Sequence, residues 1–405
     1  MVELEFSYIY DTLQDDQIWA ELMDDFSSRE EVKIKLRRMT WDTAWAELFS
    51  FTSLGNGPQV SHIGNTWVTS LARMNTLRPF KAMEIADIGS EEDFIRPNWE
   101  SGTLPGDKRI WAIPWTSWIY VITYRKDLLQ QAGIDPDGAF GTIVSARATV
   151  KKLANSSLEI PWLNPQLPVS FRDLLHIAAS WIWAAGGEIM EKDGSRTLFT
   201  GSRAVEGLKD FLDIYRAVPD EYKKLSQMEA FNLFGTGHAA ALLCNIRAAN
   251  GFIQTEEIPQ VHQNLGVASA TEVPWTGGGS FVIWENLRGY PEMERAAVKL
   301  VKYLTSKEIQ LRYCRAAYSM PSRLEALYEL YPEGNPAHDA VIQAATKGRG
   351  YTNMPIWRRV ETQLADVIGQ SVVEAADDMN ADTDAILHKH LDALAARLNI
   401  TLGAG

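Results

Sequence analysis

The sequence predicts an α/β fold that contains a largely parallel sheet and is divided into two or more domains. Segments typical of strands and of helices alternate over the first third of the chain, and parallel strands require such helical crossovers. The chain has 405 residues, more than a single compact core usually accommodates. Hydrophobic residues make up 46% of the chain and charged residues 22%, so the composition is that of an ordered globular protein.

The alternation begins with a strand over residues 2–9 and a helix over residues 13–26. The first segment, VELEFSYI, contains the aromatic and β-branched side chains that favour strands. Ile18 and Leu22 recur at helical spacing in the second segment and give it one apolar face. Residues 32–39 alternate apolar and basic side chains, as a strand with one solvated face does.

The next helix begins after Thr40, whose hydroxyl can accept a hydrogen bond from a free N–H group of the first helical turn. Trp41 and Trp45 recur at helical spacing within this helix. The turn GNGP then leads to a short strand, QVSHI. Asn65 or Thr66 can cap the helix that follows.

The later segments are more helical, with short strands between them. Gly186 and Gly187 can end the first of these helices, because glycine readily adopts the left-handed conformation of a helix end. The expected helices cover residues 171–185, 202–217, 291–304, a segment that begins at residue 306, and 360–398, and the expected strands cover residues 239–246 and 265–268.

The most aromatic stretch, RIWAIPWTSWIYVITYRKDLLQQAGI (109–134), allows two interpretations. Trp111, Trp115 and Trp118 follow the i, i+4, i+7 spacing of a helix face. Pro114 interrupts such a helix, and the β-branched and aromatic residues that follow favour a strand. The rings therefore either fill a core or form a platform for a bound molecule.

The charge balance excludes several classes of partner. Lys and Arg together number 39 and Asp and Glu together number 52, which gives a net charge of −13. Nucleic-acid phosphates and anionic lipids both require a basic surface, so we expect neither as a partner. The two cysteines, Cys244 and Cys314, form no CxxC or Cys/His cluster, so we expect no zinc site and no disulfide framework. Cys244 lies in an apolar run and is expected to be a small buried hydrophobe.

The sequence predicts no membrane-spanning segment, because no run of apolar residues reaches the length of a bilayer helix. Met1 is followed at once by a strand-like segment rather than by an apolar export segment. We therefore expect either a cytoplasmic protein or the mature form of an exported one.

Two short motifs resemble cofactor or metal sites without meeting their requirements. GTGHAA (235–240) matches the glycine pattern of a dinucleotide site, but a helix precedes it and a strand follows, the reverse of the order that places a helix N-terminus on the pyrophosphate. We therefore expect no cofactor. DMNADTD (378–384) resembles a calcium loop, but Thr383 stands at the glycine position and Lys389 at the position of the bidentate glutamate. We prefer a solvated helix junction without a metal and keep calcium as the alternative.

No motif indicates a catalytic residue, because the sequence contains no GxSxG, HExxH or GxxxxGK[ST] pattern. A glycosidase needs only two carboxylates, so a carbohydrate-active hydrolase stays open as an alternative function. The glycine run TGGGS (276–280) either lets the backbone approach a ligand closely or forms a flexible turn.

Six segments follow one another in a recognisable order. They are KIKLRRMTWDTAWAELFSF, GPQVSHIGNTWVTSLARMNTLRPF, RIWAIPWTSWIYVITYRKDLLQQAGI, FNLFGTGHAAALLCNI, TGGGSFVIW and AAVKLVKYLTSKEIQLRYCRAAYSMPSR. In this order they resemble the extracellular solute-binding proteins of ABC importers, in the carbohydrate-binding group that includes the maltose-binding proteins. The resemblance spans nearly the whole chain, although Pro58-Gln59 stands where the family often has Pro-Asp.

By this resemblance the fold consists of two α/β lobes joined by a hinge of several chain crossings, with a ligand cleft between the lobes. The N-terminal lobe would comprise residues 1–115 plus 275–318. The C-terminal lobe would comprise residues 118–268 plus 320–405. The resemblance implies neither a catalytic residue nor a cofactor.

The resemblance also implies which residues contact the ligand. IPWTSW would be the first crossing, with Trp115 and Trp118 near the ligand and Trp111 in the core. A sugar has an apolar C–H face that stacks on aromatic rings and a rim of hydroxyls that polar side chains bind. The other implied contacts are Asp11, Asn65, Thr66, Trp67, His176, Asn245, Arg247, Trp275, Gly278, Gly279 and Trp357, with Trp41, Asp42 and Arg323 as weaker candidates.

The implied function is capture of a sugar, oligosaccharide or polyol by hinge closure, followed by delivery to an ABC permease in the membrane. The protein would be a monomer without enzymatic activity, periplasmic or extracellular, and either free or anchored by a lipid. Besides a hydrolase, the alternative is the same fold with a peptide or an osmolyte as its ligand, since aromatic rings also hold quaternary amines by cation–π contact.

Overall fold

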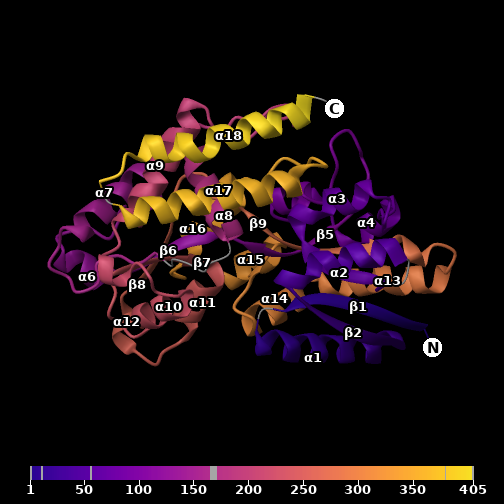
Figure 1. Cartoon of the computed structure of the whole chain (residues 1–405). Helices are drawn as coiled ribbons and strands as arrows, with labels where there is room; N and C mark the ends of the chain where they lie inside the picture. The colour runs from indigo at the N-terminus through magenta and orange to yellow at the C-terminus, as the bar shows by residue number, and fades with distance from the viewer. Residues whose placement is uncertain (1, 11, 55–56, 165–170, 379, 404–405) are drawn as a thin grey trace. The chain divides into compact units, whose positions relative to one another are not determined.

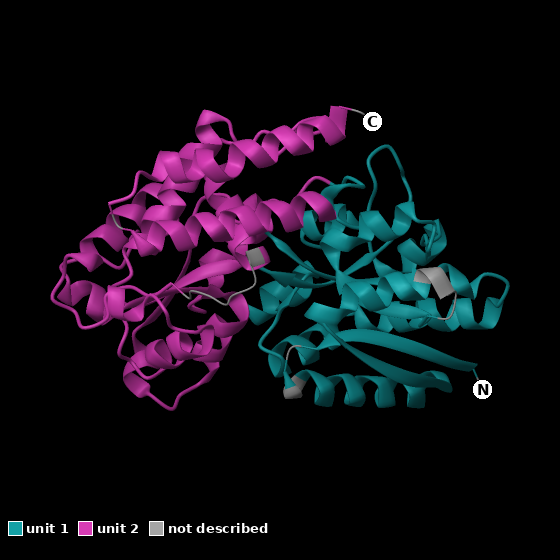
Figure 2. Cartoon of the chain, in the orientation of Figure 1, with its two compact units in different colours: residues 1–118, 276–332, 353–357 teal, residues 119–275, 333–352, 358–405 magenta. Residues whose placement is uncertain are grey.

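The computed structural model describes residues 2–10, 12–54, 57–164, 171–378 and 380–403. The chain forms two compact units (Figure 2). Unit 1 comprises Met1–Trp118, Thr276–Pro332 and Asn353–Trp357, and unit 2 comprises Ile119–Trp275, Glu333–Thr352 and Arg358–Gly405. The chain therefore passes from one unit to the other more than once.

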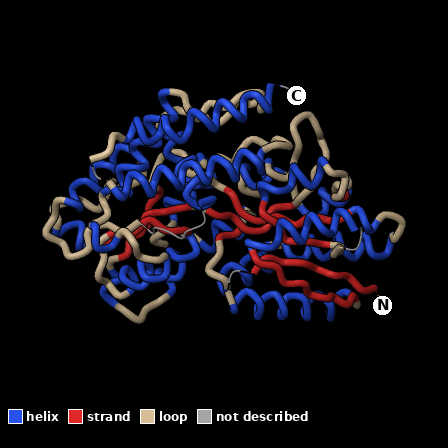
Figure 3. The backbone as a smooth tube through the Cα atoms, in the orientation of Figure 1, coloured by secondary structure: helices blue, strands red, loops and turns tan. Residues whose placement is uncertain are grey.

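Unit 1 is built on a seven-stranded sheet of mixed direction (Figures 1 and 3). Its strands are β1 (Val2–Tyr10), β2 (Val32–Thr40), β3 (Val60–Gly64), β4 (Leu77–Arg78), β5 (Ile113–Trp118), β9 (Gly277–Trp284) and β10 (Met320–Pro321). They lie in the order β10-β5-β9-β3-β1-β2, and β4 pairs with β9.

The direction of these strands corrects one prediction. β1 runs parallel to both β2 and β3, as the alternation of strands and helices predicted. β9 runs antiparallel to β3, β4 and β5, so the prediction of a largely parallel sheet was wrong. The reason is that β5 leads directly into unit 2 and β9 returns from it, so no helical crossover inside unit 1 joins these two neighbours.

The two faces of this sheet carry separate apolar cores, because alternate side chains of a strand point to opposite faces. Phe281 of β9 lies in one core and Val282 in the other. Helices α1 (Leu13–Glu30), α13 (Pro291–Leu304) and α14 (Lys307–Ala316) contribute to the first core, and α2 (Trp41–Leu54) and α3 (Val68–Arg73) to the second. The other helices of unit 1 are α4 (Ala82–Ile88), α5 (Arg96–Glu100) and α15 (Leu324–Leu330).

Residues 320–332 lie in unit 1, whereas the resemblance placed residues 320–405 in the second lobe. The short strand β10 pairs with β5, and α15 contacts both β10 and α14. These contacts join the segment to unit 1, and no local pattern in the sequence indicated them.

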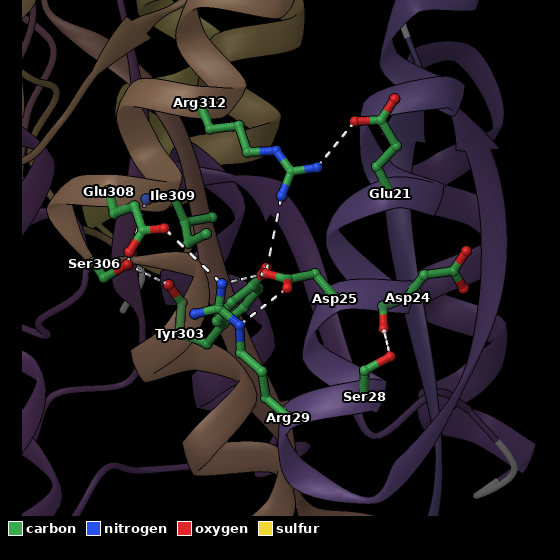
Figure 4. Close-up of polar contacts among 10 residues, drawn as sticks. All are labelled: Glu21, Asp24, Asp25, Ser28, Arg29, Tyr303, Ser306, Glu308, Ile309 and Arg312. Carbon is green, nitrogen blue, oxygen red and sulfur yellow. Dashed lines mark hydrogen bonds and ion pairs between the residues drawn. The ribbon is translucent and has the colours of Figure 1, made fainter.

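Polar side chains connect α1 to α13 and α14 at the surface of unit 1 (Figure 4). Tyr303 donates a hydrogen bond to Asp25 at 2.6 Å, Arg29 pairs with the same carboxylate at 3.0 Å, and Arg312 reaches Glu21 at 3.0 Å. The hydrogen bond from Tyr303 and the guanidinium of Arg29 lower the pKa of the Asp25 carboxyl. Because these groups are partly exposed, they orient the helices more than they stabilise the fold.

Unit 2 contains a three-stranded antiparallel sheet in which β6 (Tyr120–Arg125) lies between β7 (Ala241–Asn245) and β8 (Leu265–Ser269). Helices α8 (Phe171–Ala184) and α9 (Ser202–Arg216) approach closely at Gly207, where a Cβ would lie 2.4 Å from the carbonyl oxygen of Trp181. The other helices are α6 (Lys126–Gln131), α7 (Ile143–Ala154), α10 (Gln227–Gly235), α11 (Ile246–Gln254), α12 (Pro259–Gln263), α16 (His338–Lys347), α17 (Trp357–Asp377), whose first residue belongs to unit 1, and α18 (Thr383–Gly403).

Both cysteines are buried and neither belongs to a disulfide, and the prediction of a buried Cys244 is confirmed. Burial raises the pKa of the Cys244 thiol to about 12. Within the described part of the chain, no helix combines the length and the apolar character that a membrane crossing needs.

Gly278 of β9 permits the closest strand contact in unit 1. Its φ is 146°, and a Cβ there would lie 2.0 Å from the carbonyl oxygen of Thr116 in β5. We expect Gly278→Ala to cost roughly 2–4 kcal/mol of stability and to lower the thermal midpoint of unfolding. Gly251→Ala in α11 is the control, because a Cβ at that position meets nothing within 4 Å. Circular dichroism melting measures both variants, and equal midpoints would show that the β5–β9 contact tolerates a side chain.

Candidate functional site

In unit 1 the predicted ligand contacts gather where three parallel strands end. Since β1 is parallel to β2 and β3, the carboxyl ends of all three strands meet at one edge of the sheet. Asp11, which follows β1, lies outside the described residues. Trp41 and Asp42 follow β2 and begin α2. Asn65 and Thr66 follow β3 in a short 3-10 turn.

Trp67 is buried at this edge and supports two neighbouring rings. Trp41 and Trp45 each meet it edge to face, with ring centroids 5.6 and 5.7 Å away and interplanar angles of 72°. The Trp41 ring lies next to Gly64, where a Cβ would come within 3.2 Å of it. Trp41 is 37% exposed and Trp67 only 1%, so Trp41 is the ring that a solute can reach.

Asn65 is 6% exposed and opens the 3-10 turn that also contains Trp67. Its side-chain amide carries both donors and an acceptor, so it is a group at this edge that can exchange hydrogen bonds with a bound molecule.

His62 of β3 is a candidate that the sequence analysis did not single out. Both of its ring nitrogens are buried without a hydrogen-bond partner among the described residues, and its ring lies 6.3 Å from Trp19 and 6.1 Å from Phe281. Burial lowers the pKa of His62 to about 4, and the carboxylate of Asp15 opposes this shift. The feature of the sequence that could have identified His62 is that it is a lone histidine within the short strand QVSHI.

The aromatic stretch that includes β5 has buried tryptophans and a more exposed one. Trp115 is completely buried against Trp19, Phe281 and Tyr313, with ring centroids 4.8–5.5 Å away, so its ring packs within unit 1. The expectation of a buried Trp111 is confirmed, since this residue is 4% exposed in the second core.

Trp118, the last residue of β5, is partly exposed. Its backbone pairs with Gly277 of β9, which places its side chain at the end of the strand. Ligand contacts by Trp115 and Trp118 stay predictions, and the packing favours Trp118.

The two central glycines of TGGGS make room for neighbouring parts of unit 1. Gly278 faces the backbone of β5, as described above, and a Cβ on Gly279 would lie 2.1 Å from Nε2 of His62. The close backbone approach that the glycine run predicted is therefore an approach to β5 and to His62. Contact of these glycines with a ligand stays a prediction.

Unit 2 holds a second cluster of rings. His176 of α8 stacks on Trp275 with the ring centroids 3.9 Å apart and the planes 3° apart. Tyr351 lies 6.0 Å from Trp275, and its hydroxyl is 2.7 Å from Nδ1 of His176. Tyr120 and Trp183 complete the cluster at 6.2 Å from Trp275 and 5.8 Å from Tyr351.

The two titratable members of this cluster are both held neutral. Burial, and then the charge of Arg172, lowers the pKa of His176 well below its usual value. Burial also raises the pKa of Tyr351 well above its usual value. The Tyr351 hydroxyl and Nδ1 of His176 therefore share a hydrogen bond between two neutral groups, and the tautomer of the imidazole decides which of them donates. Sequence reasoning found His176 and Trp275 but missed Tyr351, which lies far from both in the chain.

Asn245 and Arg247 lie at the end of β7, as predicted. Asn245 caps α11, and its side-chain oxygen accepts a hydrogen bond from the backbone N–H of Ala248 at 2.9 Å. The cap uses the amide oxygen, so the NH₂ group of Asn245 is the part that can donate to a ligand. Arg247 is partly exposed in the first turn of α11.

Arg323 has structural contacts that explain its position. Its guanidinium donates to the backbone oxygens of Thr305 and Ile88 and lies 4.6 Å over the Phe94 ring. Arg323 thereby joins separate segments of unit 1. Trp357 is 3% exposed at the start of α17. Ligand contacts by Arg323 and Trp357 stay predictions.

The motifs considered for cofactors and metals have local structural explanations. GTGHAA lies between α10 and β7, so a helix precedes it and a strand follows, as predicted. In the 378–384 segment, of which Met379 lies outside the described residues, Asp382 accepts from the backbone N–H of Asp384 and Arg216 donates to the carbonyl of Ala381. Across the described residues, no group of three or more His, Cys, Asp and Glu side chains could hold a metal ion.

His62 makes the stability of the protein depend on pH. Its folded-state pKa of about 4 lies below the value near 6.5 of an unfolded chain, so stability present above pH 6.5 is lost as the pH falls toward 4. The loss is about 3 kcal/mol when complete. We expect His62→Phe to flatten the dependence of the urea midpoint on pH in this window. An unaltered slope in His62→Phe would mean that the pKa of His62 is the same in the folded and in the unfolded protein.

Comparison with known proteins agrees with this fold. Residues 21–338 match the bacterial extracellular solute-binding protein family. The diacetylchitobiose binding protein DasA of Streptomyces coelicolor is 22% identical over 400 residues, covering 93% of this chain and 88% of DasA. Among solved structures, the sugar-binding protein MalE of Xanthomonas citri superposes with a TM-score of 0.78 at 19% identity, covering 99% of this chain and 98% of MalE. A solute-binding protein of Thermotoga lettingae bound to α-D-tagatose gives 0.76 at 16% identity, with both chains fully covered. The fold is thus that of the two-lobed binding proteins of ABC transporters, and the chain belongs to the family of bacterial extracellular solute-binding proteins.

Proposed function

We propose that this protein is the solute-binding component of an ABC importer and that its ligand is a sugar, an oligosaccharide or a polyol. The observation that carries the proposal is the same combination in each unit, namely aromatic rings beside neutral hydrogen-bonding groups. In unit 1 these are Trp41 and Asn65, and in unit 2 they are Trp275 and the His176–Tyr351 pair. The names of its relatives, DasA and MalE among them, support a carbohydrate.

The chemistry of these groups suits an uncharged, hydroxylated ligand. Indole rings bury the C–H face of a sugar ring, and the quadrupole of the rings favours the polarised C–H groups. The amides of Asn65 and Asn245 and the hydroxyl of Thr66 can exchange hydrogen bonds with sugar hydroxyls. Arg247 and Asp42 can form the stronger charge-assisted hydrogen bonds.

The proposed mechanism is closure on the ligand. A ligand that contacts residues of both units would favour the conformation in which both sets of contacts are made. A ligand of micromolar affinity supplies about −8.2 kcal/mol net of the cost of closure. The repeated passage of the chain between the units supports a hinge rather than a single flexible linker.

We further propose that the protein acts without catalysis, as a monomer, and outside the cytoplasmic membrane, where it hands its ligand to the permease subunits. The natural protein would be either free or attached by a lipid. The family consists of binding proteins, and two or more carboxylates beside the rings would be needed for a glycosidase. A hydrolase would convert an oligosaccharide into shorter products, which chromatography of the incubated sugar detects.

We expect a screen of mono-, di- and trisaccharides and polyols to contain a compound that raises the melting temperature, because a ligand of the folded state stabilises by mass action. The same compound should reduce the radius of gyration in small-angle X-ray scattering. Glycine betaine and a tripeptide are included as probes of the alternative ligands. Stabilisation by betaine alone would replace the carbohydrate with a quaternary amine, and stabilisation without compaction would contradict closure.

We expect Trp118→Ala to weaken binding of the identified sugar roughly tenfold, since an aromatic contact contributes about 0.5–1.5 kcal/mol beyond the area that it buries. Because Trp118 is partly exposed, the melting temperature of the ligand-free variant should stay close to that of the wild type. Trp115→Ala is the matched variant, and it should unfold at a clearly lower temperature because it leaves a cavity in the core. Calorimetric titration and melting curves measure both effects. Unchanged affinity together with a lowered melting temperature in Trp118→Ala would make Trp118 a packing residue.

A further inference from the structure

Helix α2 of unit 1 carries an exposed row of aromatic rings. Trp41, Trp45 and Phe49 follow one another at intervals of four residues, which places them on one side of the helix about 6 Å apart along its axis. Trp41 is 37% exposed, Phe49 is 49% exposed, and Trp45 is partly exposed. Large aromatic side chains normally bury most of their surface, so three on one side of a helix need an explanation.

The row is continuous with the strand edge where the ligand contacts of unit 1 gather. Trp41 and Trp45 both rest edge-on against the buried ring of Trp67, which follows Asn65 and Thr66 in the same turn. The Trp41 ring also lies against Gly64, where a Cβ would come within 3.2 Å of it. The first two rings are therefore held in place by packing, and Phe49 lies one helical turn farther from Asn65 than Trp45 does.

The surroundings of the row favour one kind of occupant. Between Trp41 and Leu54 the helix has no lysine or arginine, which disfavours anionic lipid and nucleic acid. It offers hydrogen-bonding groups instead, with Asp42 exposed and the Thr43 hydroxyl donating to Glu47 at 2.7 Å. Three partly exposed rings bury far less than the roughly 800 Å² that each partner contributes to a stable protein interface.

We propose that Trp41, Trp45 and Phe49 are successive stacking positions for an oligosaccharide whose first ring lies beside Asn65. This inference rests on the proposed function and narrows its substrate class, because a ligand that reaches Phe49 has three or more sugar rings. A monosaccharide or polyol would contact Trp41 at most and would leave the other two rings in water.

The test compares chain lengths in calorimetric titrations of the full-length protein. The probes are malto-, cello- and chito-oligosaccharides of two and of five rings, tested on the wild type, Trp45→Ala and Phe49→Ala. Tyr290→Ala is the control, because Tyr290 is an exposed aromatic residue of unit 1 that lies outside α2. Trp45→Phe serves as a conservative variant in case the alanine variant loses stability.

In the wild type we expect the five-ring member of one series to bind at least tenfold more tightly than its two-ring member. Phe49→Ala should remove roughly two- to tenfold of that advantage while leaving the affinity for the two-ring sugar unchanged. Trp45→Ala should weaken the two-ring and the five-ring sugar alike, because both cover the second stacking position. Trp45→Phe should weaken both sugars less than Trp45→Ala does, and Tyr290→Ala should leave both affinities unchanged.

Three results would overturn the proposal. If sugars bind with no dependence on chain length, if the advantage survives in Phe49→Ala, or if Trp45→Ala binds both sugars as tightly as the wild type does, this inference fails while the proposed function stands. If Phe49→Ala instead converts a dimer into a monomer in sedimentation velocity, the row is a contact between copies of the chain. If no saccharide of any length binds, the proposed function fails and this inference fails with it.

Discussion

Unit 1 depends on the pairing of β5 with β9. These strands come from distant parts of the sequence, and β9 also pairs with β3 and β4, so a single strand joins the N-terminal part of the sheet to β5 and β10. Bringing such segments together costs conformational entropy, which the two cores on the faces of the sheet offset. The pairing also requires a position without a side chain at Gly278, because the carbonyl oxygen of Thr116 occupies the space of a Cβ.

The same pairing shapes the edge at which unit 1 offers polar groups and rings. Gly279, next to Gly278, leaves room for the His62 ring, and that ring packs among Trp19 and Phe281. A histidine in these surroundings stays neutral, because charging it would cost the hydration of the imidazolium. His62 therefore contributes a neutral, closely packed ring to unit 1.

Unit 2 also holds aromatic rings in fixed positions, but it does so with side chains of its own. Its stacked His176–Trp275 pair is held by the Tyr351 hydroxyl, and Trp275 is itself fixed by a backbone hydrogen bond to Ser180 at 2.7 Å. Rings whose positions are set by packing lose little freedom when a ligand binds, so more of the interaction energy contributes to affinity. The same reasoning applies to Trp41 and Trp45, which rest on Trp67.

Local patterns in the sequence predicted many of the helices and strands. The spacing of apolar residues predicted β1, α1, β2, α2 and β3 in order. These elements could be predicted because periodicity and capping depend on neighbours within a few residues. The ligand contacts Trp41, Asn65 and Asn245 came from the family resemblance and stay predictions, as does the absence of a nucleic-acid partner, which rests on the charge balance. The order of the segments, rather than any one motif, indicated the family.

Contacts between distant segments decided the rest. They set the antiparallel direction of β9, the place of residues 320–332 in unit 1, the burial of Trp115 against Trp19, and the meeting of Tyr351 with His176. Spacing alone could not show which of Trp115 and Trp118 is buried, because the side chains that pack over Trp115 come from distant segments. Pairing and burial are properties of chain segments that meet in space, and no local pattern encodes which segments will meet.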